Sequence, residues 1–237
     1  MKTLFTFLTI FFVAHTLRAQ EINVAAAVRY FELADSLRKD RPLSDEAWNN
    51  YLQMEGNQQY FSNQGYSEKY LARLRKDLEV VYMPQHDSLL QERLKTPQKH
   101  FGVYLLHYYK ANEPELRTYL QKIASDEEAY LDALYAETYS LLPKRLQHRK
   151  NEATVYFIGL SNDALANNGN AILTLWGAYM FDKIKHGALG GHELHHLLLQ
   201  QQDYKVDAKD ESLLLALRML LNEGAPDLID KRYTSHP

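Results

Sequence analysis

The sequence predicts an α+β protein that is mostly helical, and three observations lead to this fold class. Apolar residues recur at helical spacing from about residue 22 to residue 142. Two short runs rich in β-branched and aromatic residues follow, at 154–158 and 172–176. From residue 186 onward the spacing is helical again. We therefore expect a helical N-terminal lobe, a small sheet, and then two further helices.

The helices of the lobe are delimited by residues that typically start or stop a helix. The first expected helix runs from Val24 to Leu37 and stops before an Asp-Arg-Pro turn. Ser44 caps the second, which carries Trp48, Tyr51 and Met54 and ends at Gly56. Later helices are expected from Ser67 to Pro84, near 98–110, at 113–124, and at 126–141 with Asp126 as its cap.

The second half of the chain combines the sheet and the last two helices. Asn167-Asn168-Gly169-Asn170 forms a strong turn signal between the two predicted strands, which indicates a sheet of two or three strands. Helices are then expected at 188–202 and 210–222. The second of these contains LLLALRMLL, which is apolar almost all round, so we expect it to be buried.

Composition limits the class of protein and the kind of site. The 237 residues suffice for one sizeable domain or two small lobes, with ordinary globular content of 46% hydrophobic and 24% charged residues. The net charge of -3, without a long basic run, argues against nucleic acid or anionic membrane as a main partner. The chain has no cysteine, so any metal must be held by His, Asp or Glu.

The N-terminal residues have the pattern of an export signal. Lys2 precedes a short apolar run from Leu4 to Ala14, and Leu17 and Ala19 occupy the -3 and -1 positions for cleavage before Gln20. We expect residues 1–19 to be a signal peptide, and the alternative is an uncleaved membrane anchor. The remaining chain is then extracytoplasmic, with a helical lobe at 20–150 continuous with a metal-binding region at 151–237.

The motif that carries chemistry is H-E-x-x-H, which spans His192 to His196. Residues four apart lie on one face of a helix, so the imidazoles of His192 and His196 can converge on one ion. Zinc is the metal that this pattern favours. Glu193 lies beside the metal rather than on it, where it can act as general base towards zinc-activated water. The alternative is a helix whose histidines only face water or pack.

A second part of the pattern lies 26 residues further on, at Asn222-Glu223. A carboxylate at the edge of a buried helix needs a partner, and a zinc ion that already has two imidazole ligands is a suitable one. Asp227 can accept a hydrogen bond from the outer nitrogen of a liganding histidine. The alternatives are that Glu223 points to solvent and that Asp227 belongs to a new turn after Pro226.

His192 to His196, followed by Asn222-Glu223 and Asp227, resembles the gluzincin metallopeptidases, which pair H-E-x-x-H with a downstream N-E-x-x-x-D. The Glu-Gly start and the run from Asp227 to Asp230 are also similar to bacterial zinc-dependent peptidase domains of unknown function. The resemblance covers about 188–231 and implies a zincin-like fold. It implies His192, His196 and Glu223 as zinc ligands, Glu193 as the base, and Asn222 and Asp227 as residues that support the ligands.

Three features depart from that pattern. His195 occupies a spacer position that is usually apolar and offers a competing ligand at i+3. Pro226 is expected to disturb a helix that continues past Glu223. Fourteen residues follow Glu223, and only Tyr233 and His236 among them offer an oxyanion-stabilising group, which stays unassigned.

The resulting hypothesis is an exported zinc metallopeptidase that acts on a peptide or protein. We expect the substrate to lie extended beside an edge strand at 171–176. The alternatives are a catalytically weak or inactive zinc-binding relative, a helical interaction protein in which the motif is coincidental, and a zinc hydrolase with a non-peptide substrate. The sequence does not determine the oligomeric state.

Overall fold

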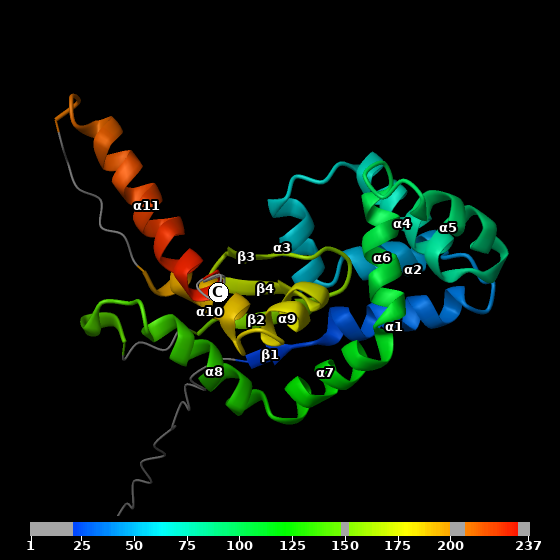
Figure 1. The fold of residues 1–237 in the computed structure, drawn as a ribbon, viewed down its shortest axis with the longest axis horizontal. Coiled ribbons are helices and arrows are strands. Elements are labelled where there is room, and N and C mark those ends of the chain that lie inside the picture. Colours follow the sequence, from blue (N-terminus) through cyan, green and yellow to red (C-terminus); the bar gives the residue numbers. More distant parts are fainter. Residues whose placement is uncertain (1–20, 148–151, 200–206, 232–237) are drawn as a thin grey trace, which may run out of the picture.

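The computed structural model describes residues 21–147, 152–199 and 207–231, and its fold is α+β with mostly helical content, as predicted (Figure 1). The expected signal peptide at 1–19 lies outside the described residues. The same holds for Tyr233 and His236. None of the described helices is both long and apolar enough to cross a membrane.

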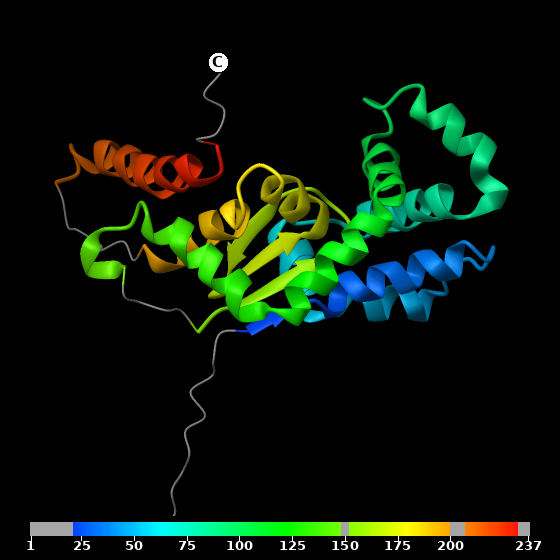
Figure 2. The same ribbon diagram turned by 60° about the horizontal axis from the view of Figure 1, so that its bottom comes forward.

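Eight α-helices precede residue 140 in the described part of the chain. The helices α4, α5 and α6 gather at one end of the molecule, and α10 and α11 lie at the other (Figures 1 and 2). The bounds are α1 Ala25–Leu37, α2 Asp45–Leu52, α3 Glu55–Asn63, α4 Glu68–Tyr82, α5 Asp87–Leu94, α6 Phe101–Ala111, α7 Glu113–Ser125 and α8 Glu127–Tyr139, with short 3-10 turns at Pro84–His86 and Lys144–Leu146.

The three predicted N-caps are confirmed. The side chains of Ser44, Ser67 and Asp126 accept hydrogen bonds from the backbone N–H three residues ahead, at 3.1, 3.3 and 3.2 Å. Each bond satisfies one of the N–H groups that the first turn of a helix leaves without an intrahelical partner.

The predicted end of the second helix at Gly56 is wrong. Helix α2 ends at Leu52, and Gly56 lies inside α3, a helix that the sequence did not predict. A Cβ at Gly56 would lie 2.9 Å from Cβ of Tyr156 in the sheet. The glycine therefore allows α3 to approach the sheet closely, rather than stopping a helix.

The sheet has four strands in the order β1-β2-β4-β3. Strands β1, β2 and β4 are parallel, and β3 pairs antiparallel with β4 through the predicted Asn168-Gly169 turn. The bounds are β1 Glu21–Asn23, β2 Thr154–Ile158, β3 Ala164–Asn167 and β4 Asn170–Thr174. Strand β1 comes from the segment that was expected to be helical and joins the start of the helical lobe to β2.

Two expectations about the strand at 172–176 are wrong. Strand β4 ends at Thr174, whose hydroxyl accepts a hydrogen bond from Gly177 N and caps α9 (Leu175–Asp182), so Trp176 is helical. Strand β4 also lies between β2 and β3 in the interior of the sheet, so the two edge strands are β1 and β3.

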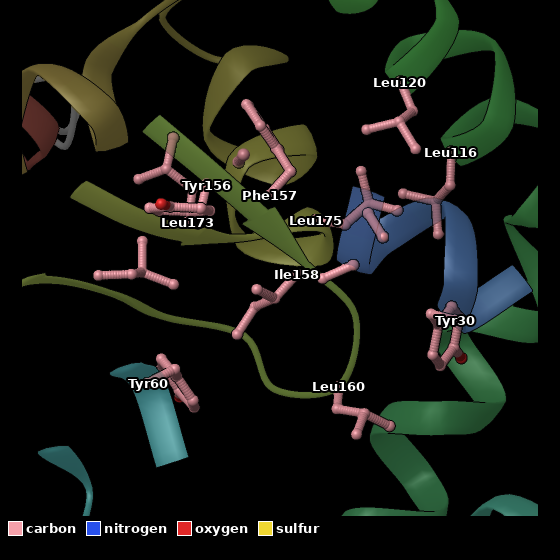
Figure 3. Packing of buried hydrophobic residues seen from close by; sticks show 14 of the residues in the cluster. Tyr30, Tyr60, Leu116, Leu120, Tyr156, Phe157, Ile158, Leu160, Leu173 and Leu175 are labelled. Carbon is pink, nitrogen blue, oxygen red and sulfur yellow. The ribbon is translucent and has the colours of Figure 1, made fainter. Parts of the chain in front are cut away.

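The hydrophobic core is one cluster of buried side chains that includes residues of the sheet, α1 and α7 (Figure 3). Tyr30 and Phe157 are fully buried there, and a Cβ at Gly159 would lie 2.4 Å from Cγ of Tyr30. Helix α10 (Ala188–Leu198) packs on β3, β4 and α8. The sheet therefore supports the helix that carries the H-E-x-x-H motif.

The last helix, α11, runs from Glu211 to Asp230 and projects from the body of the molecule (Figures 1 and 2). The predictions that it is buried and that Pro226 interrupts it are both wrong. Helix α11 contacts α10 and α8, and its buried residues, Pro226, Ile229 and Asp230, all lie in its last turns. Its large apolar side chains are exposed: Leu213, Leu215, Leu217, Met219, Leu220, Leu221 and Leu228.

Candidate metal centre

Two features of the local sequence fix the position of helix α10. Gly187 adopts a left-handed backbone conformation with φ of 76°, and its N–H donates to Oδ1 of Asp182 at 2.8 Å. A Cβ at Gly190 would lie 1.7 Å from Cδ2 of Leu134, and a Cβ at Gly191 would lie 2.8 Å from Cβ of Glu137. The glycine pair therefore lets α8 approach the turn of α10 that precedes His192.

The two outer histidines of the motif converge. Nε2 of His192 lies 3.1 Å from Nε2 of His196, and the ring centroids are 4.9 Å apart. His192 is buried at 9% exposure, and His196 is partly buried. The helix has thus placed both imidazoles on one face with the same ring nitrogen turned inward.

Glu223 approaches this pair from α11. Its Oε2 lies 3.8 Å from Nε2 of His196, and its side chain is 61% exposed. Asn222 donates from Nδ2 to Oε1 of Glu223 at 2.8 Å. The structure therefore brings Glu223 to the histidines and gives Asn222 a contact with the predicted ligand, although Glu223 was expected to lie on a buried helix.

These donor atoms fit zinc. One atom from each of His192, His196 and Glu223 lies within 4.8 Å of the other two. Two nitrogen ligands of a tetrahedral zinc ion, each bonded at about 2.0–2.1 Å, lie roughly 3.3 Å apart, which is close to the separation of the imidazoles. Two imidazoles and one carboxylate are also a set that leaves a fourth position for water or substrate.

Glu193 is buried beside this cluster at 5% exposure. Burial raises the pKa of its carboxyl to about 7, and the nearby negative charges of Asp230 and Glu223 act in the same direction, while His192 opposes them. Burial and the neighbouring His192 lower the pKa of His196. A carboxyl group with a pKa near neutrality can both accept and return a proton.

His195 lies outside the group formed by His192, His196 and Glu223. It is buried at 1% exposure, and burial lowers the pKa of its imidazole to about 4, which keeps it neutral. Two groups of possible metal ligands occur in the described residues, and neither includes His195. Its ring therefore belongs to the interior of the protein.

The carboxylate nearest to the outer nitrogen of His192 is Asp230 rather than the predicted Asp227. Nδ1 of His192 lies 3.3 Å from Oδ1 of Asp230 and 4.0 Å from Oδ1 of Asp227. The sequence analysis assigned no role to Asp230. Helical spacing contains the missing signal, because Glu223, Asp227 and Asp230 stand at i, i+4 and i+7 and share one face of an uninterrupted helix.

Comparison with known proteins gives one match. The model of a family described as "Putative zinc dependent peptidase (DUF5700)" matches residues 48–237. No curated protein and no solved structure matches the chain. The matched residues include α10, α11 and every strand except β1.

Proposed function

The chain belongs to the DUF5700 family, whose description names a zinc-dependent peptidase, and we propose that it hydrolyses peptide bonds, with His192, His196 and Glu223 as zinc ligands and Glu193 as the general base. The observation that carries the proposal is the convergence of the two Nε2 atoms at 3.1 Å beside a buried carboxyl group. This arrangement contains both a metal-binding group and a proton acceptor.

Each chain residue has a distinct part in the proposed reaction. His192 and His196 would hold the metal through Nε2, and Glu223 would complete the ligand set from the solvent-exposed side. A zinc ion held in this way supplies Lewis-acid chemistry, because it polarises a carbonyl group and makes water more acidic. Asn222 restrains the carboxylate of Glu223 by donating to its Oε1.

Glu193 is the proposed proton-transfer group. Its carboxylate takes a proton from the attacking water and then gives it to the nitrogen of the leaving amine as the C–N bond breaks. Burial raises the pKa of this carboxyl, which makes it a stronger base than an exposed glutamate.

An extended substrate is proposed to pair with β3, the edge strand on which α10 packs. Asn168 and Gly169 have φ of 48° and 79°, as in a two-residue type I′ turn, so Asn167 and Asn170 form the hydrogen-bonded pair that closes the hairpin. Hydrogen-bonded and non-hydrogen-bonded residue pairs then alternate between β3 and β4. The hydrogen bond from Thr174 N to Asp163 O fits this alternation. The backbone N–H and C=O of Ala166 consequently point away from β4, towards a substrate.

Export is part of the proposal and rests on residues 1–19, which precede the described part of the chain. The mature protein then begins at Gln20 and works outside the cytoplasm on a peptide or protein. The N-terminal sequence of the protein recovered from its native host tests this directly. A chain that starts at Gln20 supports export with cleavage, and one that retains residues 1–19 contradicts cleavage.

Digestion of a broad peptide library by the zinc-loaded protein tests the activity. We expect cleavage that a chelator abolishes and that added zinc restores. Stoichiometric zinc without cleavage would identify a zinc-binding relative that has lost activity. A protein that binds no zinc would contradict the metal centre and leave a helical interaction protein.

A further inference from the structure

We infer that Asp230 is the positioning residue for the zinc ligand His192, and that Asp227, at the position implied by the family resemblance, has a different partner. The inference rests on the proposed function, because it concerns a ligand of the same metal centre. Nδ1 of His192 and Oδ1 of Asp230 are 3.3 Å apart. Both atoms are buried and neither forms a hydrogen bond with a described residue, so at 3.3 Å each offers the other the partner that it lacks.

Burial distinguishes the two aspartates. The side chain of Asp230 is 5% exposed, whereas that of Asp227 is 41% exposed. Burying a carboxylate without a hydrogen-bond donor or a positive charge costs free energy. His192 can supply that donor to Asp230, and Asp230 can supply the acceptor for Nδ1 of His192. Asp227 has no such need, since solvent reaches it.

Asp227 is also engaged elsewhere. Its Oδ1 accepts a hydrogen bond from Nζ of Lys231, one helical turn further along α11, and forms an ion pair with it. The same oxygen lies 4.0 Å from Nδ1 of His192, too far for a hydrogen bond. The ion pair therefore directs Asp227 along its own helix rather than across to α10.

The fold holds Asp230 in place through the residue before it. Lys185 donates from Nζ to the carbonyl oxygen of Ile229 at 3.1 Å and forms an ion pair with Glu137 of α8. Cγ2 of Ile229 would lie 3.5 Å from a Cβ at Gly191. Lys185 thus connects α8 with the last turn of α11, and both contacts lie close to His192.

The chemical consequence concerns the tautomer of His192. An acceptor at Nδ1 favours the imidazole that carries its proton there, which leaves the lone pair of Nε2 for the metal. Nε2 is the atom that faces His196. Asp230 therefore selects the nitrogen with which His192 binds zinc and fixes the orientation of the ring.

Zinc affinity measured by competition with a chromophoric chelator tests this inference without requiring activity. We expect Asp230→Asn to weaken zinc binding by about 10–100-fold, the usual effect of losing the carboxylate behind a histidine ligand. Asp227→Asn should change affinity by less than about threefold. Asp132→Asn, at an exposed position of α8, is the matched control and should leave affinity unchanged.

The outcomes separate the two proposals. If the wild-type chain binds no zinc, the metal centre and this inference both fail. If the wild type binds zinc while Asp230→Asn binds it equally well, or if Asp227→Asn is the weaker variant, only the role of Asp230 is overturned.

A measurement on the wild type avoids any folding defect of the variants. In the zinc-loaded protein labelled with 15N-histidine, NMR should detect His192 protonated at Nδ1 and metal-bound at Nε2. A proton on Nε2, with Nδ1 as the ligand, would overturn the inference.

Discussion

Nε2 of His192 lies 3.1 Å from Nε2 of His196, one helical turn away on α10. At this distance one neutral imidazole can donate its Nε2–H to the lone pair of the other, whereas two metal ligands each need a free lone pair at Nε2. Zinc binding must therefore replace one hydrogen bond with two metal–nitrogen bonds. Because both histidines belong to α10, zinc binding is expected to change the stability of this helix.

Zinc should stabilise the fold measurably. At a free zinc concentration 100 times the Kd, we expect the free energy of unfolding to rise by about 2.7 kcal/mol, because the ion binds the folded chain. Thermal unfolding with and without zinc measures the shift. His196→Ala should abolish most of it, and an equal shift in that variant would place the zinc elsewhere.

Glu193→Gln should separate metal binding from catalysis. We expect the variant to retain zinc and to lose about two to four orders of magnitude in kcat, because the amide cannot accept the proton. Steady-state cleavage of a peptide selected from the library measures the loss. Glu92→Gln, an exposed change on α5, is the control, and undiminished turnover in Glu193→Gln would remove the assigned base.

The close approach of α8 to α10 should make Gly190 intolerant of a side chain. A Cβ there would lie 1.7 Å from Cδ2 of Leu134, and such overpacking typically costs about 1–3 kcal/mol. Chemical denaturation of Gly190→Ala measures the free energy of unfolding. Gly224→Ala is the matched control, since a Cβ there meets no described atom within 4 Å apart from its chain neighbours and its own helix backbone, and alanine favours a helix by about 0.5–1 kcal/mol. Equal stability of the two variants would contradict the packing.

Ala166→Pro should weaken substrate binding while preserving the sheet. The substitution removes an outward N–H, which is worth about 0.5–1.5 kcal/mol, or roughly 2–12-fold in kcat/KM. Zinc content and the melting temperature should change little, because edge strands tolerate proline. Leu165→Pro is the contrasting variant, since its N–H belongs to the ladder with β4 and its loss should destabilise the protein. Unchanged kcat/KM in Ala166→Pro would argue against pairing at β3.

Local signals predicted the fold wherever they act within a few residues. Ser44, Ser67 and Asp126 start helices because their side chains bond to N–H groups three residues away. The Asn168-Gly169 turn is confirmed for the same reason, since it depends on two left-handed residues. The α+β class and the zinc-dependent peptidase family follow from such patterns.

The features that the sequence did not predict depend on long-range packing. Strand β1 forms only because Ile22 pairs with Val155 far along the chain. The position of β4 inside the sheet depends on β3 folding back on it. The exposed surface of α11 was not predicted because an apolar sequence specifies a preference for burial, whereas the contacts that a helix makes depend on how distant segments pack.

The same contrast between local signals and long-range packing applies to the candidate site. Spacing on one helix was enough to bring His192 and His196 together. The choice between Asp227 and Asp230 depended on which turn of α11 faces His192 and on the ion pair of Asp227 with Lys231. Neither can be derived from the H-E-x-x-H motif alone.

Anomalous diffraction at the zinc absorption edge, from crystals of the zinc-loaded protein, tests the central claim most directly. We expect one zinc ion per chain, about 2.0–2.2 Å from Nε2 of His192, Nε2 of His196 and a carboxylate oxygen of Glu223. No zinc peak between α10 and α11, or a zinc ion bound there without Glu223, would contradict the account.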